Sequence, residues 1–295
     1  MSLYLVAGNG APADPAPTAQ HLPTSRPRRY PSDTTDTEWQ IMSCYVPVGG
    51  TVPGRGGGPV SYPRRDIVDA IRYLDHNSCV WRALPADFPP WDTVYHYFRA
   101  WNRDGTLTRM HNGLREQVRL AEGRAAEPTG AILDSQSVRG AETVAKSSRG
   151  FDAGKKVEGR KRHIAVDTTG LLLAVLVTAA SVQDRHGAWP LLWALAICLQ
   201  TISMVWVDGA YSGGPVAYGA TLGLSVQVVN KLAGQVGFAV LPRRWVVERT
   251  LAWINRCRRT TRDYERLPEH HAAMVQWSMV IIMTRRLARL QRQAA

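Results

Sequence analysis

"RKRHIAVDTTGLLLAVLVTAA", residues 160 to 180, contains two apolar runs with a short polar segment between them. The runs 161–167 and 171–179 are rich in the aliphatic and β-branched residues that favour strands. The intervening "DTTG", residues 167–170, supplies the aspartate, threonines and glycine that tight turns prefer. The stretch therefore predicts a hairpin, and with it a sheet at the centre of the fold.

The segments around this hairpin predict a larger mixed sheet. "GAILDSQSV", residues 130–138, predicts a strand that ends near Asp134, and "ISMVWVDGAYSGG", residues 202–214, predicts a strand that stops at Asp208. Three early strands followed by alternating helices and strands are typical of an α/β fold in which helices flank a mixed sheet. The other elements expected after residue 180 are helices over 184–199 and 214–224, a strand over 225–230 and helices from 243 to the end.

Helical spacing replaces the strand pattern before residue 127. Apolar residues recur every three or four positions in 32–46, 64–77 and 91–105, and a further helix is expected over 105–123. Region 31–126 should therefore be a small all-helical unit, either a helix-turn-helix or a plain helical bundle. The sheet and the later helices make up region 127–295. Residues 1–30, rich in proline, alanine and threonine, are expected to be disordered.

The chain is strongly basic, and its charge is unevenly distributed. The 295 residues carry a net charge of +12, and residues 241–295 hold twelve arginines against four acids. A second basic stretch lies at 139–163, and the two together favour a polyanion such as nucleic acid, with a solvated basic face as the alternative. No apolar run approaches the roughly 18 residues that span a bilayer. The four cysteines lack metal or disulfide spacing, so a cytoplasmic protein is expected.

Three acids are candidates for chemistry. Asp134 and Asp208 stand at predicted strand ends, where a sheet usually holds its ligands, although either could simply cap a turn. Glu248 lies in "RRWVVERTLAWINRCRR", residues 243–259, beside the apolar stripe of a predicted helix and one turn after Arg244. It could be half of a surface ion pair. With the two aspartates it could instead bind magnesium, which prefers a few carboxylate oxygens together with substrate phosphate.

These segments resemble the catalytic blocks of bacterial DDE transposases. "ILDSQSV", "WVDGAYSG" and the stretch that begins "RRWVVERTLAW" are similar to the three blocks of insertion sequence family five, within the insertion sequence four superfamily. The resemblance covers roughly residues 30–290. It implies a ribonuclease H-like core in which Asp134, Asp208 and Glu248 are catalytic and hold two Mg²⁺ ions, for which Mn²⁺ can substitute. The implied activity is cleavage and transfer of DNA strands by in-line phosphoryl transfer.

The superfamily signature around the glutamate is Y-x2-R-x3-E-x6-K. Arg244 and Glu248 match it, whereas Leu241 stands at the tyrosine position and Asn255 at the lysine position. The roles of that tyrosine and that lysine are therefore not carried over to this chain.

The implied partner is double-stranded DNA, both the terminal inverted repeats of an insertion sequence and the target. The resemblance also implies a homo-oligomer, a dimer on DNA, that acts at the nucleoid, with region 31–126 binding the element ends. A catalytically silent DNA-binding descendant of a transposase and a nuclease that cuts without strand transfer remain alternatives. The side chains expected to contact DNA are Arg244, Arg249 and Arg256 on the last helices, Lys155, Lys156, Arg160, Lys161 and Arg162 at the start of the hairpin, and His96, Arg99 and Arg103 on the helix over 91–105.

Overall fold

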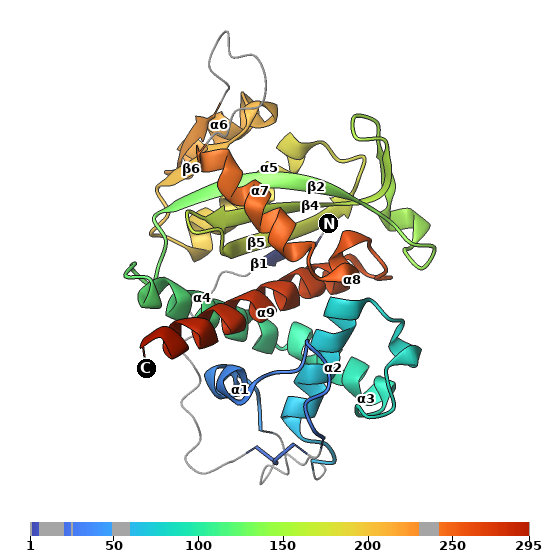
Figure 1. Cartoon of the computed structure of the whole chain (residues 1–295). Helices are drawn as coiled ribbons and strands as arrows, with labels where there is room; N and C mark the ends of the chain where they lie inside the picture. Colours follow the sequence, from blue (N-terminus) through green and yellow to red (C-terminus); the bar gives the residue numbers. More distant parts are fainter. Residues whose placement is uncertain (1, 6–20, 25, 49–59, 230–241, 295) are drawn as a thin grey trace, which may run out of the picture.

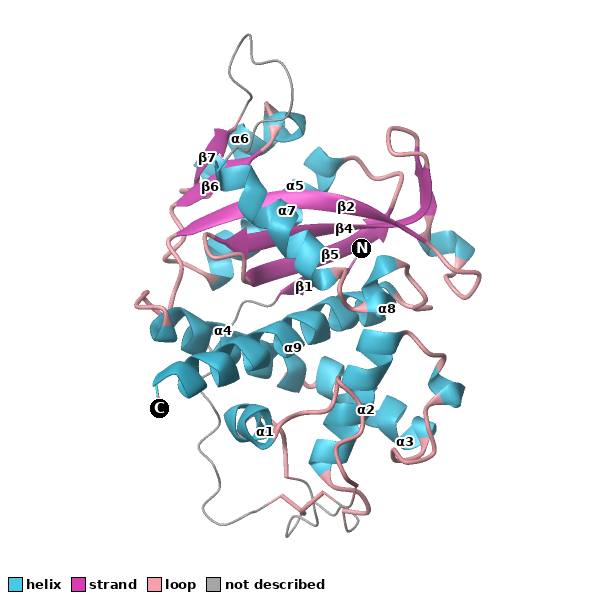
Figure 2. Ribbon diagram, in the orientation of Figure 1, coloured by secondary structure: helices cyan, strands magenta, loops and turns pink. Residues whose placement is uncertain are grey.

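The computed structural model describes residues 2–5, 21–24, 26–48, 60–229 and 242–294. Seven strands of these residues form one sheet in the upper half of the molecule, with helices below it and on both of its faces (Figure 1; Figure 2). The sheet order is β1-β5-β4-β2-β6-β7, and β3 pairs with β4. The strands are β1 (Ser2–Leu5), β2 (Gly130–Arg139), β3 (Gly150–Asp152), β4 (Val157–Asp167), β5 (Leu172–Ala179), β6 (Met204–Val207) and β7 (Ser225–Val228).

The sheet is mixed, as the sequence predicted. β4 lies between β5 and β2 and is antiparallel to both, whereas β2, β6 and β7 run parallel to one another. The parallel pairs place the carboxyl end of β6 beside the middle of β2, because Ile132 pairs with Trp206. Asp208, two residues after Trp206, therefore comes close to Asp134, two residues after Ile132.

The hairpin predicted from residues 160–180 is confirmed as β4 and β5. At its turn, one carboxylate oxygen of Asp167 accepts hydrogen bonds from the backbone N–H groups of Thr169 and Leu171, at 2.8 and 2.9 Å. The other oxygen pairs with Arg119 on helix α4 (Thr106–Ala121). Both partners of this ion pair are buried. The turn therefore fastens the sheet to the helices beneath it.

β2 is longer than the sequence pattern predicted. It continues past Asp134 to Arg139, because β4 reaches back to Val157 and pairs with the whole extension. Ser135, Gln136 and Ser137 of the extension have polar partners; Gln136, for example, accepts a hydrogen bond from Arg162 of β4. Asp134 therefore lies in the middle of β2 and not at its end.

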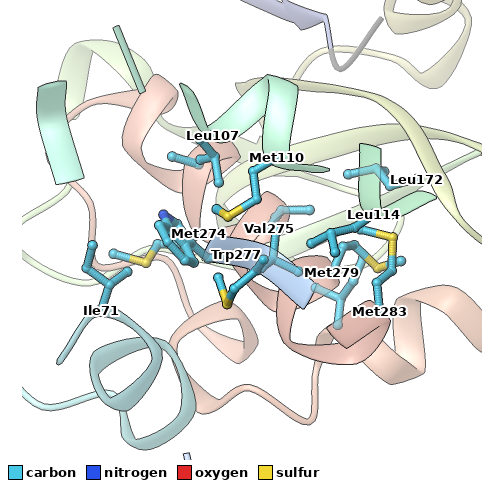
Figure 3. Close-up of a cluster of buried hydrophobic side chains, with 14 of the residues drawn as sticks. Ile71, Leu107, Met110, Leu114, Leu172, Met274, Val275, Trp277, Met279 and Met283 are labelled. Atoms are coloured by element: carbon cyan, nitrogen blue, oxygen red, sulfur yellow. The ribbon is translucent and has the colours of Figure 1, made fainter. Parts of the chain in front are cut away.

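The N-terminal helices pack around the long C-terminal helix α9 (Pro268–Ala294), which runs beneath the sheet (Figure 1). Figure 3 shows Trp277 and Met283 of α9 together with Leu107 and Met110 of α4, all of them buried. The same apolar cluster reaches the sheet through Leu172. This apolar cluster thus contains residues from both sides of the expected boundary near residue 126. The other N-terminal helices are α1 (Asp36–Ser43), α2 (Arg64–Asn77) and α3 (Trp91–Arg103), with a short 3₁₀ helix, η1 (Trp81–Ala83).

These helices form a bundle, and the tight helix–helix turn lies between α3 and α4. It consists of Asp104 and Gly105, and Gly105 has a φ of 79°, which glycine adopts without steric cost. Thirteen residues separate α2 from α3, too many for the short turn of a helix-turn-helix. The helix after the tight turn, α4, is largely buried against α9. Of the two expected arrangements, the structure shows the bundle.

The two faces of the sheet have different covers. Helices α5 (Asp184–Cys198) and α6 (Gly214–Thr221) cover one face through a second apolar cluster that includes Leu133 and Leu191. Helix α7 (Pro242–Ile254) crosses the other face in front of β2, followed by α8 (Arg258–Thr261) (Figure 1). Two further 3₁₀ helices are η2 (Lys146–Ser148) and η3 (Gly209–Tyr211). No helix within the described ranges is long and apolar enough to cross a membrane.

Two expectations about the chain ends need correction. Disorder is wrong for the described part of residues 1–30: β1 pairs with β5, and Arg26, whose side chain is 6% exposed, forms ion pairs with Asp33 and Asp87 at 3.0 and 3.3 Å. Residues 6–20 and 25 lie outside the described residues. The helical C-terminal segment is interrupted between α8 and α9, where the buried Asp263 binds Arg160 at 2.9 Å. In both places long-range ion pairs stabilise segments that local patterns do not reveal.

Candidate active site

The three acids of the predicted triad lie on elements that meet at the front of the sheet. Asp134 is in β2, Asp208 follows β6, and Glu248 is on α7, which packs across β2 (Figure 1). Because side chains alternate along a strand, Asp134 points to the same face as Ile132, which belongs to the cluster beneath α7. Val247 and Leu251 bury the other side of α7 in that cluster. Glu248 is consequently left exposed beside the front of β2.

Arg244 joins two of these carboxylates. Its guanidinium lies 3.8 Å from a carboxylate oxygen of Asp208 and 3.5 Å from one of Glu248. The Asp208 side chain is 25% exposed and that of Glu248 is 46% exposed, so solvent reaches both. The contact with Glu248 follows from helical spacing, four residues apart. The contact with Asp208 had no signal in the sequence, because it depends on how α7 crosses β6.

Asp134 belongs to the same electrostatic neighbourhood. Its pKa is raised to about 6, first by burial and then by the negative charge of Asp208, while the backbone N–H of Ser135 and the charges of Lys155 and Arg244 oppose the rise. That N–H donates to the Asp134 carboxylate at 2.7 Å. A carboxyl group whose pKa is raised by a neighbouring carboxylate marks a place of excess negative charge. A bound cation would relieve this repulsion.

The chemistry of the donor set fits a divalent metal ion. The three side chains offer only carboxylate oxygens, the ligands that Mg²⁺ prefers, with room for water or phosphate at the solvent-exposed side. No three described His, Cys, Asp or Glu side chains stand at metal-ligand spacing, and Arg244 is the cation that lies beside Asp208 and Glu248. The site as described is therefore an arginine-bridged set of carboxylates.

A second layer of ion pairs supports β2 from the α5 side. Lys161 of β4 is buried and pairs with Asp184 at 2.9 Å and with Asp152 at 3.2 Å. Asp184 also accepts a hydrogen bond of 2.7 Å from the hydroxyl of Ser135, the residue after Asp134. Lys161 was expected to contact DNA, but both of its partners are inside the protein. It helps to hold the β2 backbone at the site.

Arg160 and Arg162, also expected to contact DNA, are fully buried. Arg160 binds Asp263 and the carbonyl oxygen of Glu265, the latter at 2.8 Å. Arg162 donates to Asn255 at 2.6 Å and to the carbonyl oxygen of Thr260 at 2.9 Å. These guanidinium groups fasten the end of α7 and the segment after α8 to the sheet. We therefore assign them a structural role in place of the expected DNA contact.

The pair of Arg162 and Asn255 also explains a departure from the family signature. Asn255 occupies the lysine position of the signature, and its side-chain oxygen accepts a hydrogen bond from Arg162. A positive charge is thus present next to this position, but it comes from β4, 93 residues away in the chain. No local pattern in the sequence could have shown this contact.

The remaining basic candidates are accessible to different degrees. Lys155 and Lys156 are exposed in the turn between β3 and β4, and the Lys155 amine lies 3.4 Å from the carbonyl oxygen of Ser135. Arg249 of α7 is half-buried, and Arg256, just after the end of that helix, is exposed. The structure therefore places Lys155 close to the triad, whereas Lys156 faces solvent beside it.

The three basic residues of α3 lie far from the triad but close to one another. His96, Arg99 and Arg103 are exposed and line one pocket of about 430 Å³ with His270 of α9. The opposite side of α3 is buried through Val94 and other apolar residues, as the sequence predicted. The helix thus presents a basic face to solvent.

Comparisons with known proteins agree on one family. Residues 125–283, more than half of the chain, match the family described as "Transposase DDE domain". Residues 34–111 match the family described as "Putative transposase of IS4/5 family". A similar protein from Burkholderia cepacia, "Putative transposase for insertion sequence element IS402", is 30% identical over 138 residues, which are 44% of this chain and 65% of that protein. No solved structure gives a significant match.

The matched segment contains β2, β6 and α7 with all three acids, and the mixed sheet flanked by helices is the ribonuclease H-like fold that such a domain implies. The second match covers the N-terminal helices from α1 to the first part of α4. The chain belongs to the DDE transposase family.

Proposed function

We propose that this protein is the transposase of an insertion sequence, which binds the terminal inverted repeats and catalyses cleavage and transfer of DNA strands. The observation that carries the proposal is the convergence of Asp208 and Glu248 on Arg244, with Asp134 in the same electrostatic neighbourhood. Family membership supports it. The protein would work as a dimer on DNA, because an element has two ends to hold.

The proposed chemistry is two in-line attacks on phosphorus. In the first, water attacks a phosphate at the element end, the bond to the 3′ oxygen breaks, and a 3′-hydroxyl is released. In the second, this hydroxyl attacks a phosphate of the target, and a target 3′ oxygen leaves. Asp134, Asp208 and Glu248 would hold Mg²⁺, with Mn²⁺ as a substitute; when bound, two such ions activate the attacking oxygen and stabilise the leaving oxygen.

The chain's own residues have separate tasks in this scheme. The three carboxylates supply fixed negative charge on rigid elements, which orients whatever cation they hold. Arg244 supplies positive charge at the same place and can neutralise a phosphate oxygen through its planar guanidinium. Lys155 and Lys156 add charge at the edge of the site without reading the base sequence.

Strand transfer distinguishes this proposal from its nuclease alternative. We expect the purified protein, with Mg²⁺ and a labelled duplex that carries the element end, to join that end to an unlabelled circular DNA. Products that are cut but never joined would favour a nuclease. The absence of both cutting and joining, with binding intact, would favour a catalytically silent DNA-binding protein.

The lysine pair should contribute to the electrostatic part of DNA binding. The logarithm of the affinity falls with the logarithm of salt concentration, with a slope of about −0.9 per neutralised phosphate. Lys155→Gln with Lys156→Gln is expected to flatten that slope by up to about two units, as measured by fluorescence anisotropy at several salt concentrations. Arg185→Gln, an exposed change on α5 at the opposite face, is the control. A slope equal to that of wild type would place the β3–β4 turn away from DNA.

Recognition of the element ends is proposed for the basic face of α3. We expect His96→Ala, Arg99→Gln and Arg103→Gln, combined in the full-length protein, to reduce the preference for a terminal-repeat duplex over a scrambled one. Each side chain that hydrogen-bonds to a base edge supplies about 1–3 kcal/mol of discrimination, which its removal abolishes. Competition binding measures the preference, and Arg124→Gln, an exposed change in the segment after α4, is the control. An unaltered preference in the triple variant would move recognition to another surface.

A further inference from the structure

A pocket rich in arginine lies between α9 and α7, the helix that carries Glu248. It has a volume of about 550 Å³ and is lined by Arg249, Trp253 and Arg256 of α7 and its C-terminal end, and by Arg285, Arg286 and Arg289 of α9. At the front of the molecule α7 runs obliquely across the sheet, and its C-terminal end approaches α9 beneath the sheet (Figure 1). Five guanidinium groups thus surround one concave surface that the proposed chemistry does not use.

Most of this positive charge is not neutralised inside the protein. The acid among the lining residues is Glu122, next to the end of α4, which pairs with Arg286. Arg256 and Arg289 are exposed, and within the described ranges their side chains form no hydrogen bond or ion pair. Arg285 lies 4.0 Å from a carboxylate oxygen of Glu38, which is outside the pocket, and donates to the carbonyl oxygen of Pro31 at 2.6 Å; its side chain remains 41% exposed. The pocket therefore has charge available for an anionic ligand.

Part of the pocket is held in place before any ligand arrives. The Arg249 guanidinium stacks on the rings of Trp245 and Trp253, 4.7 and 4.6 Å from their centres. It also donates to the carbonyl oxygen of Thr169 at 2.9 Å. An arginine fixed by aromatic rings loses little conformational freedom when it binds a phosphate. The wall formed by α7 is consequently preorganised.

The geometry of α7 relates the pocket to the triad. Arg249 follows Glu248 directly and lies about 100° round the helix from it. Arg256, just past the end of the helix, is eight residues beyond Glu248, about 12 Å in the direction of the helix axis. Along the axis of a DNA duplex each strand advances about 3.4 Å per nucleotide, so this distance corresponds to about three to four nucleotides. A duplex whose axis runs along α7, with one phosphate at Glu248, would therefore bring later phosphates to the pocket.

We propose that this pocket is a binding site for the DNA backbone, which grips phosphates about three to four nucleotides from the cleaved bond. The inference rests on the proposed function, which it extends to a second surface. A guanidinium group can donate two parallel hydrogen bonds to two oxygens of one phosphate. Five arginines in one pocket therefore suit a chain of phosphates better than one small anion. A second copy of the protein carries the same net charge of +12 and offers little complementary charge. DNA is the polyanion that the triad also requires.

The test compares two charge-removing variants of the full-length protein. The pocket variant is Arg256→Gln with Arg289→Gln. The matched control is Arg28→Gln with Arg185→Gln, which removes two charges from exposed residues outside the pocket. Affinity for a short duplex of arbitrary sequence is measured at several salt concentrations, because phosphate contacts do not depend on sequence. We expect the pocket variant to flatten the salt slope by up to about 1.8 units and the control to change it by less.

A variant that is expected to strengthen DNA binding distinguishes a role of the pocket in binding from damage to the fold. Glu122→Gln removes the acid that pairs with Arg286, so it is expected to steepen the salt slope by up to about 0.9 units and to strengthen binding. Poly-glutamate is tested as a competing ligand. If the pocket variant loses poly-glutamate binding but keeps the wild-type DNA slope, the pocket serves an acidic protein segment and our inference is overturned. Should the wild-type protein itself fail to bind the duplex, the proposed function fails first.

Discussion

Asp134→Asn and Asp208→Asn are each expected to abolish cleavage of an end-containing duplex while DNA binding stays close to that of wild type. Each change removes one negative charge and preserves the shape of the side chain. The remaining site can then hold a divalent cation only weakly. We expect the cleavage rate to fall by at least about a hundredfold to a thousandfold, the loss that enzymes show when one preorganised charge-stabilising group is removed. Gel-based cleavage and anisotropy binding, on the same duplex, measure the two effects separately.

Asp184→Asn is the matched control for these two variants. Asp184 is also a carboxylate near β2, but its partners are Lys161 and Ser135, on the α5 side of the sheet. We expect it to lower thermal stability and to retain cleavage within about tenfold of wild type. Near wild-type cleavage by either Asp134→Asn or Asp208→Asn would remove that residue from the triad.

Glu248→Gln should also reduce cleavage by orders of magnitude while the fold and DNA binding persist. An exposed ion pair with Arg244 contributes only about 0–1 kcal/mol, so a glutamate with that role alone would be nearly dispensable. As a metal ligand it is required at the moment of reaction. Binding of DNA in the absence of metal is expected to strengthen slightly, because a charge that repels phosphate is gone. Mn²⁺ should restore part of the activity.

Arg244→Gln separates these two roles of the glutamate. If Glu248 serves only the ion pair, then Glu248→Gln, Arg244→Gln and the double variant should have equal effects in a double-mutant cycle. If Glu248 is a ligand, its variant should lose cleavage and Arg244→Gln should mainly weaken DNA binding. Cleavage in Mg²⁺ within a few-fold of wild type would leave Glu248 as an ion-pair residue.

The sequence predicted β2, β4, β5, β6 and β7, but not β1 or β3, because the signals of those five strands are local. The hairpin of β4 and β5 combines two apolar runs with a turn around Asp167, and each of these features is visible within twenty-one residues. The helix α7 was equally clear, because Val247, Leu251 and Ile254 follow helical spacing and all three are buried. Patterns of this kind depend only on which face of an element meets the core.

The predictions that failed depend on partners far away in the chain. The run "RKR" at residues 160–162 has the composition of an exposed basic patch, yet Arg160 and Arg162 are buried against residues 93 to 106 positions later. The extension of β2 beyond Asp134 looks like a loop, because its stabilising partners are on β4. β1 is only four residues long and finds its place on β5. A single sequence contains no local signal for such contacts.

Asp134, Asp208 and Glu248 are proposed to form one metal centre, and the binding of a metal ion tests this without any catalytic step. Mn²⁺ binding, followed by electron paramagnetic resonance, is compared between the wild-type protein and the three single variants Asp134→Asn, Asp208→Asn and Glu248→Gln. We expect the wild-type protein to remove free Mn²⁺ from solution and every one of the three variants to bind it more weakly. Equal binding by the wild-type protein and all three variants would contradict a shared centre, because the ion would then be held elsewhere.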